Sequence, residues 1–333
     1  MSSPHLPSLR ARFGASVACG LLLAAALTGC TAEARPSAAP ATTASASATA
    51  TASAGVSVAS RERLAVDGGT REYLLRRPAA HGGAPRPLLI AFHGRGADAE
   101  HLRRQSGLDR AADERGMLLV YPEALGKAWG AGSAPTAQRP DPDSDVRFTE
   151  ALVAELVRTG RADPHRVYVA GFSNGGSMAL RMAAQRPDLV AGAVSVSGEL
   201  PTGAAAVKPT GAVSTMIVYG AEDPVRPLAG LPSPGPAGPG EEPMTPTMSA
   251  RASAEAFATA GGAGGPVEEG KPGYDSVTWP PGSAGAAVRL LVLHGAGHTW
   301  PGSAMPPPAD FGAVSTALDA SSTLLDFLAA QRR

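Results

Sequence analysis

The feature that most constrains the fold is the pentapeptide Gly171-Phe172-Ser173-Asn174-Gly175. It lies between a short run rich in β-branched and aromatic residues, 166–170, and a segment at 177–185 whose residues favour a helix. A strand that turns directly into a helix needs a very sharp turn, and glycine on either side of the central residue avoids steric clashes. Such a turn would raise the Ser173 hydroxyl above a sheet edge, where a base and a substrate could both reach it.

A Gly-x-Ser-x-Gly match is weak evidence by itself, because the chain has 40 glycines among 333 residues. Composition alone gives roughly 0.4 expected matches per chain, so an ordinary glycine-rich turn is the alternative and the surrounding sequence must decide. Asp223 follows the apolar run 216–219, and His298 follows the apolar run 288–293. Serine, acid and histidine in this order, each after a strand, are typical of the α/β-hydrolase fold. The sequence therefore predicts Ser173 as nucleophile, Asp223 as acid and His298 as base.

Each partner of the serine has a rival nearby in the sequence. His294 precedes His298 by four residues, but it falls at the end of a predicted strand, whereas His298 lies on a glycine-rich loop. The glycines between the two histidines argue against a helix that presents both to a metal ion. Glu222 is next to Asp223, and Asp223 is preferred because Pro224 fixes the chain just beyond it.

Acyl transfer also needs hydrogen-bond donors for the negatively charged oxygen of the tetrahedral intermediate. One expected donor is the backbone N–H of Asn174, the residue after the nucleophile. The second is expected from the loop 93–96, where the backbone N–H of Arg95 is the candidate. His93 is interpreted as a histidine that braces this loop rather than as a catalytic group.

Three aromatic residues near these motifs are candidate substrate contacts, and packing in the core is the alternative for each of them. An aromatic side chain can contact a sugar ring, an aromatic acid or an aliphatic ester equally well. The three candidates are Trp129, Phe172 and Trp300.

Alternating strand and helix patterns predict a mostly parallel, doubly wound sheet preceded by an antiparallel hairpin, that is, an α/β fold. The hairpin is expected around Asp67-Gly68-Gly69. A long Pro/Gly-rich segment at 228–247 interrupts the pattern and is expected to be functional or disordered. Strands are predicted at 87–93, 117–122, 189–196, 213–219, 274–279 and 287–294, and helices at 98–115, 145–159, 248–260 and 314–330.

The first 60 residues are predicted to lie outside the folded domain. Residues 1–29 have a basic start and an apolar stretch that is short for a membrane span, which predicts a lipoprotein signal peptide cut before Cys30. A plain secretory signal is the alternative. Residues 30–60 are mostly Ala, Ser, Thr and Pro, which predicts a disordered tether. The catalytic domain is expected over 61–333, on the extracellular face of the cell membrane or secreted.

Charge and cysteine content limit the possible partners. The formal net charge is zero and no cluster of Lys or Arg is present, so nucleic acid is not an expected partner. The two cysteines are Cys19, within the signal peptide, and Cys30, the expected lipidation site. The mature domain is therefore expected to have no disulfide, no thiolate metal site and no cysteine nucleophile. We also expect a monomer.

Several motifs together resemble the secreted poly(3-hydroxybutyrate) depolymerase-like esterases, a group similar to feruloyl and acetylxylan esterases. The resemblance spans roughly residues 85–305 in order. It implies an α/β-hydrolase fold, serine carboxylester hydrolysis without a cofactor, and the same three triad residues. The motifs are His93-Gly94-x-Gly96, Gly171-Phe172-Ser173-Asn174-Gly175-Gly176, Asp223-Pro224-Val225 and Gly297-His298-Thr299-Trp300-Pro301-Gly302.

The sequence thus predicts a serine ester hydrolase that forms an acyl-enzyme with an extracellular ester. Polyhydroxyalkanoate oligomers, feruloyl esters and acetyl esters are the expected substrates, either free or in polymeric or carbohydrate-linked form. A cell-envelope acyltransferase is an alternative because it would use the same triad. A non-catalytic surface lipoprotein is a further alternative, although such a protein would be expected to lack a triad member.

Overall fold

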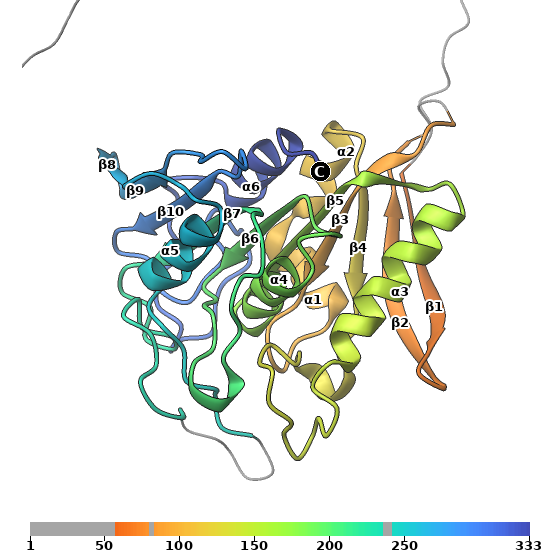
Figure 1. Ribbon diagram of the computed structural model, residues 1–333, viewed down its shortest axis with the longest axis horizontal. Coiled ribbons are helices and arrows are strands. Elements are labelled where there is room, and N and C mark those ends of the chain that lie inside the picture. The colour runs from red at the N-terminus through yellow and green to blue at the C-terminus, as the bar shows by residue number, and fades with distance from the viewer. Residues whose placement is uncertain (1–56, 80–82, 236–241) are drawn as a thin grey trace, which may run out of the picture. The chain divides into compact units, whose positions relative to one another are not determined.

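The computed structural model describes residues 57–79, 83–235 and 242–333, and a ten-stranded sheet runs through the described part (Figure 1). The predicted signal peptide, Cys30 and most of the predicted tether lie outside the described residues. The strands are β1 (Val58–Val66), β2 (Gly69–Arg77), β3 (Arg86–Phe92), β4 (Leu118–Pro122), β5 (Ala162–Phe172), β6 (Gly192–Val196), β7 (Ser214–Gly220), β8 (Val267–Lys271), β9 (Tyr274–Trp279) and β10 (Val288–Leu293). The helices are α1 (Ala99–Ser106), α2 (Leu108–Glu114), α3 (Ser144–Arg158), α4 (Asn174–Gln185), α5 (Ala250–Ala260) and α6 (Ala320–Ala329), with single 3-10 turns at Leu125–Lys127 and Gly203–Ala205.

The strand order is β1-β2-β4-β3-β5-β6-β7-β10-β9-β8. The six central strands, from β4 to β10, pair in parallel, whereas the pairs at both edges are antiparallel. The mostly parallel α/β-hydrolase sheet is thus confirmed. The predicted hairpin is also present, because Asp67 and Gly68 both have positive φ angles and join β1 to β2. No helix of the described residues is long and apolar enough to cross a membrane.

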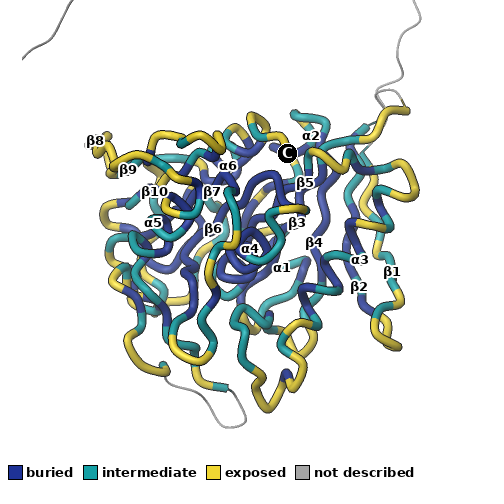
Figure 2. Tube along the Cα trace, viewed as in Figure 1, coloured by how far each residue is buried: buried dark blue, intermediate teal, exposed yellow. Residues whose placement is uncertain are grey.

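Helices cover both faces of the sheet and enclose two apolar cores (Figure 2). Alternate residues of β3 show the division, since Leu88 and Ile90 point into one core while Leu89 and Ala91 point into the other. Helices α3, α4 and α5 pack on the first face, and α1, α2 and α6 pack on the second. The central strands are buried on both sides, as expected for parallel strands between two helical layers.

Two predicted helices have different bounds in the structure. The helix expected over 98–115 is two helices, because Gly107 adopts a left-handed conformation that ends α1 and precedes α2 directly. The helix expected over 314–330 begins only at Ala320, after the N-cap Asp319. The carbonyl of Ser315 instead accepts a hydrogen bond from the N–H of Gly302, so this stretch bonds to a neighbouring loop and does not form a helix.

Strands β1 and β8 differ from the prediction. β1 begins at Val58, so residues 58–60 belong to the sheet rather than to the predicted tether; Val58 pairs with Arg77. Small residues such as Ala59 can occupy an edge strand because the ladder needs only their backbone groups. β8 was not predicted at all, because each of its five residues is exposed and no apolar alternation marks it.

The Pro/Gly-rich segment 228–247 is ordered on both sides of the undescribed residues 236–241. Its flanks pair with each other, since Thr247 N donates to Leu231 O and Gly235 N donates to Met244 O. Residues 242–245 and Thr247 line the large cavity described below. The segment is therefore part of the wall of that cavity.

Candidate active site

Ser173 lies on the turn between β5 and α4 and has a φ angle of 55° and a ψ angle of −119°. Such angles are strained for a residue with a side chain, and strain of this kind gathers at functional sites. A Cβ atom at Gly171 would come within 2.2 Å of the carbonyl oxygen of Gly175. A Cβ atom at Gly175 would come within 2.1 Å of the carbonyl oxygen of Phe92. The sharp turn predicted from the pentapeptide is present, and it requires both glycines.

Four neighbouring parallel strands carry polar residues just beyond their carboxyl ends. Strands β5, β6, β7 and β10 are adjacent in the sheet, so their carboxyl ends share one edge. Ser173 follows β5, Asp223 follows β7 and His298 follows β10. Glu199, which follows β6, was not predicted, although its place after a strand was available as a signal.

The structure brings Ser173, His298 and Asp223 into one hydrogen-bonded chain. The Nε2 atom of His298 is 2.8 Å from the hydroxyl of Ser173, and its Nδ1 atom is 2.7 Å from Oδ2 of Asp223. The other carboxylate oxygen, Oδ1, accepts from the backbone N–H groups of Val225 and Arg226 at 2.9 and 2.8 Å. Asp223 is therefore buried with both of its oxygens hydrogen-bonded.

The rival residues lie elsewhere. His294 is about half exposed and its Nε2 atom is 2.9 Å from Asp275 Oδ2, on the surface. Glu222 is also exposed. Neither forms a hydrogen bond to Ser173, so the geometry agrees with the preference for His298 and Asp223.

Aromatic rings and a backbone bond hold the imidazole of His298. The Phe172 ring is 4.9 Å from the imidazole between centroids, and Phe311 meets it edge-on at 5.2 Å. The backbone N–H of His298 donates to the carbonyl of Phe311 at 2.6 Å. Phe311 was not predicted, because nothing local in the sequence marks a contact with a residue 13 positions earlier on another loop.

The two predicted oxyanion donors come from segments beside the serine. Asn174 is the first residue of α4, where backbone N–H groups have no partner within the helix. A Cβ atom at Gly94 would lie 3.7 Å from Ser173 Cβ, so the chain that continues to Arg95 passes next to the nucleophile. Arg95 and Asn174 both line the same cavity as Ser173.

His93 braces this loop as predicted. Its Nδ1 atom donates to the carbonyl of Gly94 at 2.8 Å, and its Nε2 atom accepts from the N–H of Ala124 at 3.2 Å. Burial lowers the pKa of the His93 imidazole, which favours the neutral ring that these two bonds require. His93 is therefore a structural residue beside the site.

Trp129 connects the segments that carry the two predicted donors. Its indole N–H donates to the carbonyl of His93 at 2.9 Å. Its backbone N–H donates to Asn174 Oδ1 at 2.6 Å, and Asn174 Nδ2 donates back to its carbonyl at 3.1 Å. The ring is only 3% exposed and packs edge-on against Phe92. These contacts give Trp129 a positioning role, and contact with a substrate stays a prediction.

The other two predicted substrate contacts are also buried. Trp300 is 1% exposed and donates from its indole N–H to Ser321 Oγ at 3.1 Å, which ties it to α6. Phe172 is 5% exposed and packs on His298. Both line the cavity, but Trp300 belongs mainly to the core between α1, α6 and the sheet. Their contact with a substrate also remains a prediction.

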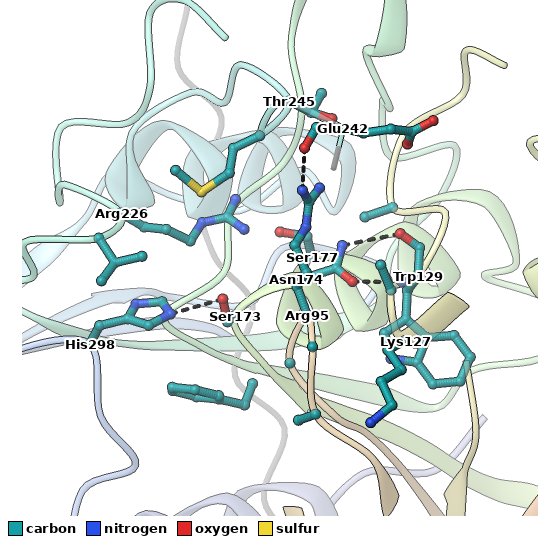
Figure 3. A pocket seen from close by; sticks show the side chains of 18 of the residues that line it. Arg95, Lys127, Trp129, Ser173, Asn174, Ser177, Arg226, Glu242, Thr245 and His298 are labelled. Atoms are coloured by element: carbon teal, nitrogen blue, oxygen red, sulfur yellow. Dashed lines mark hydrogen bonds between the residues drawn. The ribbon is translucent and has the colours of Figure 1, made fainter. Parts of the chain in front are cut away.

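A cavity of about 1720 Å³ opens around Ser173 (Figure 3). Its apolar lining residues include Met244, Phe311, Val314 and the prolines at 306–308. Glu199 and Arg226, neither of which was predicted, line it as buried charged residues. Within residues 57–79, 83–235 and 242–333, no three His, Cys, Asp or Glu side chains are grouped so as to hold a metal ion.

Arg181 supports the loop 130–143, part of which lines the cavity. Its side chain is completely buried on α4, the helix that begins after Ser173. Such a buried cation needs hydrogen-bond acceptors, and all of its partners but one come from this loop. They are the carbonyls of Gly130, Gly132 and Pro142, the carboxylate of Asp143, and the side chain of Gln185 on α4.

Comparison with known proteins agrees with this geometry. The phospholipase/carboxylesterase family matches residues 137–231. The chain is 43% identical over 289 residues to the protein named "Putative esterase NocK" of Nocardia uniformis subsp. tsuyamanensis, covering 82% of this chain and 83% of the relative. It is 27% identical over 236 residues to feruloyl esterase B of Piromyces equi, covering 68% of this chain but only 42% of that protein.

A solved structure shares the fold. The acetyl xylan esterase from Aspergillus awamori aligns with a TM-score of 0.52 at 15% identity, over 81% of this chain and 99% of the other. Identity at this level is evidence for the fold, whereas the extended match to the Nocardia protein is evidence for the family. The chain therefore belongs to the phospholipase/carboxylesterase family of α/β-hydrolases, a family of carboxylic ester hydrolases.

Proposed function

We propose that this protein hydrolyses esters through a catalytic triad of Ser173, His298 and Asp223 and a covalent acyl-enzyme. The observation that carries the proposal is the continuous chain of hydrogen bonds from the Ser173 hydroxyl through both imidazole nitrogens of His298 to Asp223. A serine hydroxyl is a poor nucleophile at neutral pH and needs an adjacent base. The strained turn that presents Ser173 to the cavity also supports the proposal.

In the proposed reaction, Ser173 Oγ attacks the ester carbonyl carbon while His298 Nε2 takes the hydroxyl proton. The backbone N–H groups of Arg95 and Asn174 would stabilise the resulting oxyanion, and loss of one such donor typically raises the barrier by roughly 3–4 kcal/mol. His298 then gives the proton to the departing alcohol, which leaves the acyl group on Ser173. Water, deprotonated by His298, releases the acid and restores the serine. Asp223 keeps Nδ1 protonated and stabilises the imidazolium throughout.

The proposed substrates are extracellular feruloyl or acetyl esters, or oligomers of a polyhydroxyalkanoate. Relatives named feruloyl esterase and acetylxylan esterase support the first two. The partly apolar cavity of about 1720 Å³ is large enough for an aromatic acid or for a short oligomer. A panel of p-nitrophenyl, feruloyl, acetyl-xylan and hydroxybutyrate esters would rank these classes.

Replacement of the nucleophile gives the largest effect and tests the mechanism. Ser173→Ala should lower kcat by at least about 10⁴-fold with the fold intact, because only the attacking oxygen is removed. His298→Ala should be nearly as severe, whereas the matched control His294→Ala should change kcat by less than about threefold. The measurement is p-nitrophenyl acetate hydrolysis together with circular dichroism. Full turnover by Ser173→Ala, or a greater loss in His294→Ala than in His298→Ala, would contradict the triad.

We also propose that the domain is attached to the outer face of the cell membrane through lipid on Cys30. The motivation is the segment Leu27-Thr28-Gly29-Cys30 after an apolar stretch, followed by the Ala/Ser/Thr/Pro-rich residues up to about 57. Acyl chains anchor by burying methylene groups, each worth about 0.8 kcal/mol, so several chains hold a protein firmly.

Cys30→Ser should move the protein from the membrane fraction to the soluble fraction and leave esterase activity unchanged. Cell fractionation and mass spectrometry of the mature N-terminus measure both parts of this prediction. A Cys30→Ser protein that stays in the membrane fraction, or a wild-type protein that begins with an unmodified residue, would show the lipoprotein proposal to be wrong.

A further inference from the structure

Arg226 is a buried arginine that the proposed mechanism does not use. It comes three residues after Asp223, and its backbone N–H donates to Asp223 Oδ1. Its side chain lines the cavity, and Figure 3 shows the guanidinium extending into the cavity beside Ser173 and His298. A ligand atom bound to this guanidinium would therefore have a fixed position relative to the triad.

The guanidinium of Arg226 makes no hydrogen bond to any residue that the structure describes. Its side chain is only 8% exposed, and its Nε atom is buried without a partner. A buried charged group without hydrogen bonds is costly, because the bonds it would make to water are lost without replacement. Arg181 is a contrasting case in the same fold, since protein groups supply five hydrogen bonds to its guanidinium.

Glu199 is the acid nearest to the Arg226 guanidinium, but it does not form a hydrogen bond with it. The closest approach is 3.6 Å, between Arg226 Nη2 and Glu199 Oε2, which is too long for a hydrogen bond. Glu199 Oε2 instead accepts from the hydroxyl of Thr247 at 2.7 Å, while Oε1 has no hydrogen-bond partner among the residues described. Burial also raises the pKa of the Glu199 carboxyl, which weakens its action as a permanent counter-charge. The fold thus leaves donors of Arg226 unsatisfied inside the substrate cavity.

We propose that Arg226 binds a carboxylate of the substrate, so that the enzyme prefers esters whose acyl or alcohol part carries a carboxylate on an apolar body. A guanidinium presents its N–H groups as a planar fork that matches a carboxylate, and such charge-assisted bonds are about twice as strong as neutral ones. The apolar lining residues of the cavity, which include Met244, Phe311 and 306–308, would contact the body of the substrate. This inference rests on the proposed ester hydrolysis at Ser173.

The test compares pairs of esters in which one member carries a free carboxylate and the other carries its methyl ester. For the acyl side, the pair is 4-nitrophenyl hydrogen adipate and its methyl ester. For the alcohol side, the pair is 4-acetoxybenzoate and methyl 4-acetoxybenzoate. The quantity measured is kcat/KM for the anionic ester divided by kcat/KM for its neutral partner. General damage to the catalytic machinery cancels in this quotient, because both esters meet the same variant.

In wild type, at least one of the two quotients should exceed one, and Arg226→Met should lower that quotient by about tenfold or more. Arg226→Lys keeps the charge but not the fork, so it should retain part of the preference. The inference is overturned if Arg226→Met leaves both quotients within about twofold of wild type. It is also overturned, without any variant, if both wild-type quotients are below one.

Two further measurements separate this inference from the proposed function. Hydrolysis of the neutral esters by wild type, and its loss in Ser173→Ala, tests the proposed function alone. Calorimetric titration of Ser173→Ala with 4-acetoxybenzoate and with adipate monomethyl ester tests the carboxylate site without turnover. At least one of the two should bind, and adding Arg226→Met should weaken its binding by about tenfold or more. Binding that is equally tight without the arginine, or no binding of either anion, would show the site to be wrong even if esters are hydrolysed.

Discussion

Arg181 and Arg226 are two buried arginines beside the same cavity, and they differ in how far the fold satisfies them. The guanidinium of Arg181 is saturated by three carbonyls, a carboxylate and an amide. The guanidinium of Arg226 makes no hydrogen bond to the described residues and has Glu199 only at 3.6 Å. Two buried acids of the site differ in the same way. Both oxygens of Asp223 are hydrogen-bonded, whereas Oε1 of Glu199 has no hydrogen-bond partner in the described part of the chain.

The number of hydrogen bonds that the fold supplies to a buried charged group separates structural groups from groups that can bind a ligand. A charged group whose partners all come from the fold holds segments of chain in place, and its removal leaves several polar groups unsatisfied. A charged group with incomplete bonding inside a cavity has free capacity for a ligand. Arg181 and Asp223 are of the first kind, and Glu199 and Arg226 are of the second.

The two acids should differ most in catalysis. Asp223→Asn should lower kcat by about 10⁴-fold, because an amide favours the wrong tautomer of His298. Glu199→Gln should change kcat for a neutral ester by at most about tenfold, since among the described residues Glu199 forms no hydrogen bond with a triad side chain. Both substitutions are nearly isosteric, so the comparison tests charge rather than packing. A loss in Glu199→Gln as large as that in Asp223→Asn would place Glu199 in the reaction itself.

The two arginines should differ in stability. Arg181→Met should lower the free energy of unfolding by about 3 kcal/mol or more, because it leaves Asp143 and three partly buried carbonyls without their donor. Arg226→Met removes no side-chain hydrogen bond to the described residues and should cost about 1 kcal/mol or less. Urea unfolding of both variants gives the two values. Equal losses would mean that Arg226 is as much a structural residue as Arg181.

The pH dependence of stability gives the smallest effect. Burial raises the pKa of Glu199 above its ordinary value of 4.5, so the folded state binds this proton more tightly than the unfolded state. Its contribution to stability is complete below pH 4.5 and is lost as the pH rises through the raised folded pKa.

The free energy of unfolding of wild type minus that of Glu199→Gln should therefore fall as the pH rises from 4.5. Taking the difference cancels the titration of every other group. Urea unfolding at a series of pH values measures it. A difference that rises with pH would show that Glu199 is stabilised as the charged form, as a closed ion pair with Arg226 would require.

The sequence was sufficient for the parts of the site that depend on local geometry. The turn at Ser173 needs Gly171 and Gly175 because backbone atoms fill the space of their Cβ atoms, and this requirement is visible in a pentapeptide. Asp223 and His298 follow strands that are mostly apolar, so their place at the sheet edge follows from the strand pattern.

Features that depend on distant contacts could not be predicted. Gly107 divides one helical pattern into α1 and α2, and the pattern of apolar residues does not show the interruption. Glu199 lies between β6 and β7, whereas Arg226 and Thr247 lie far apart in the long connection from β7 to α5, and no local pattern shows that the three meet. The same is true of Arg181, whose partners lie about 40 to 50 positions earlier in the chain.

The loop that carries the base is joined to one side of the cavity by backbone bonds. His298 N–H donates to the carbonyl of Phe311, and the Gly297 N–H and the Thr299 hydroxyl both bond to the carbonyl of Ala313. A change in that segment to admit a different acyl chain would also shift the base. Residues of the segments 130–139 and 243–245 also line the cavity, and they include neither a triad member nor Trp129. New ester specificities should therefore evolve more readily by substitutions in these two segments, where the shape of the cavity can change without loss of turnover.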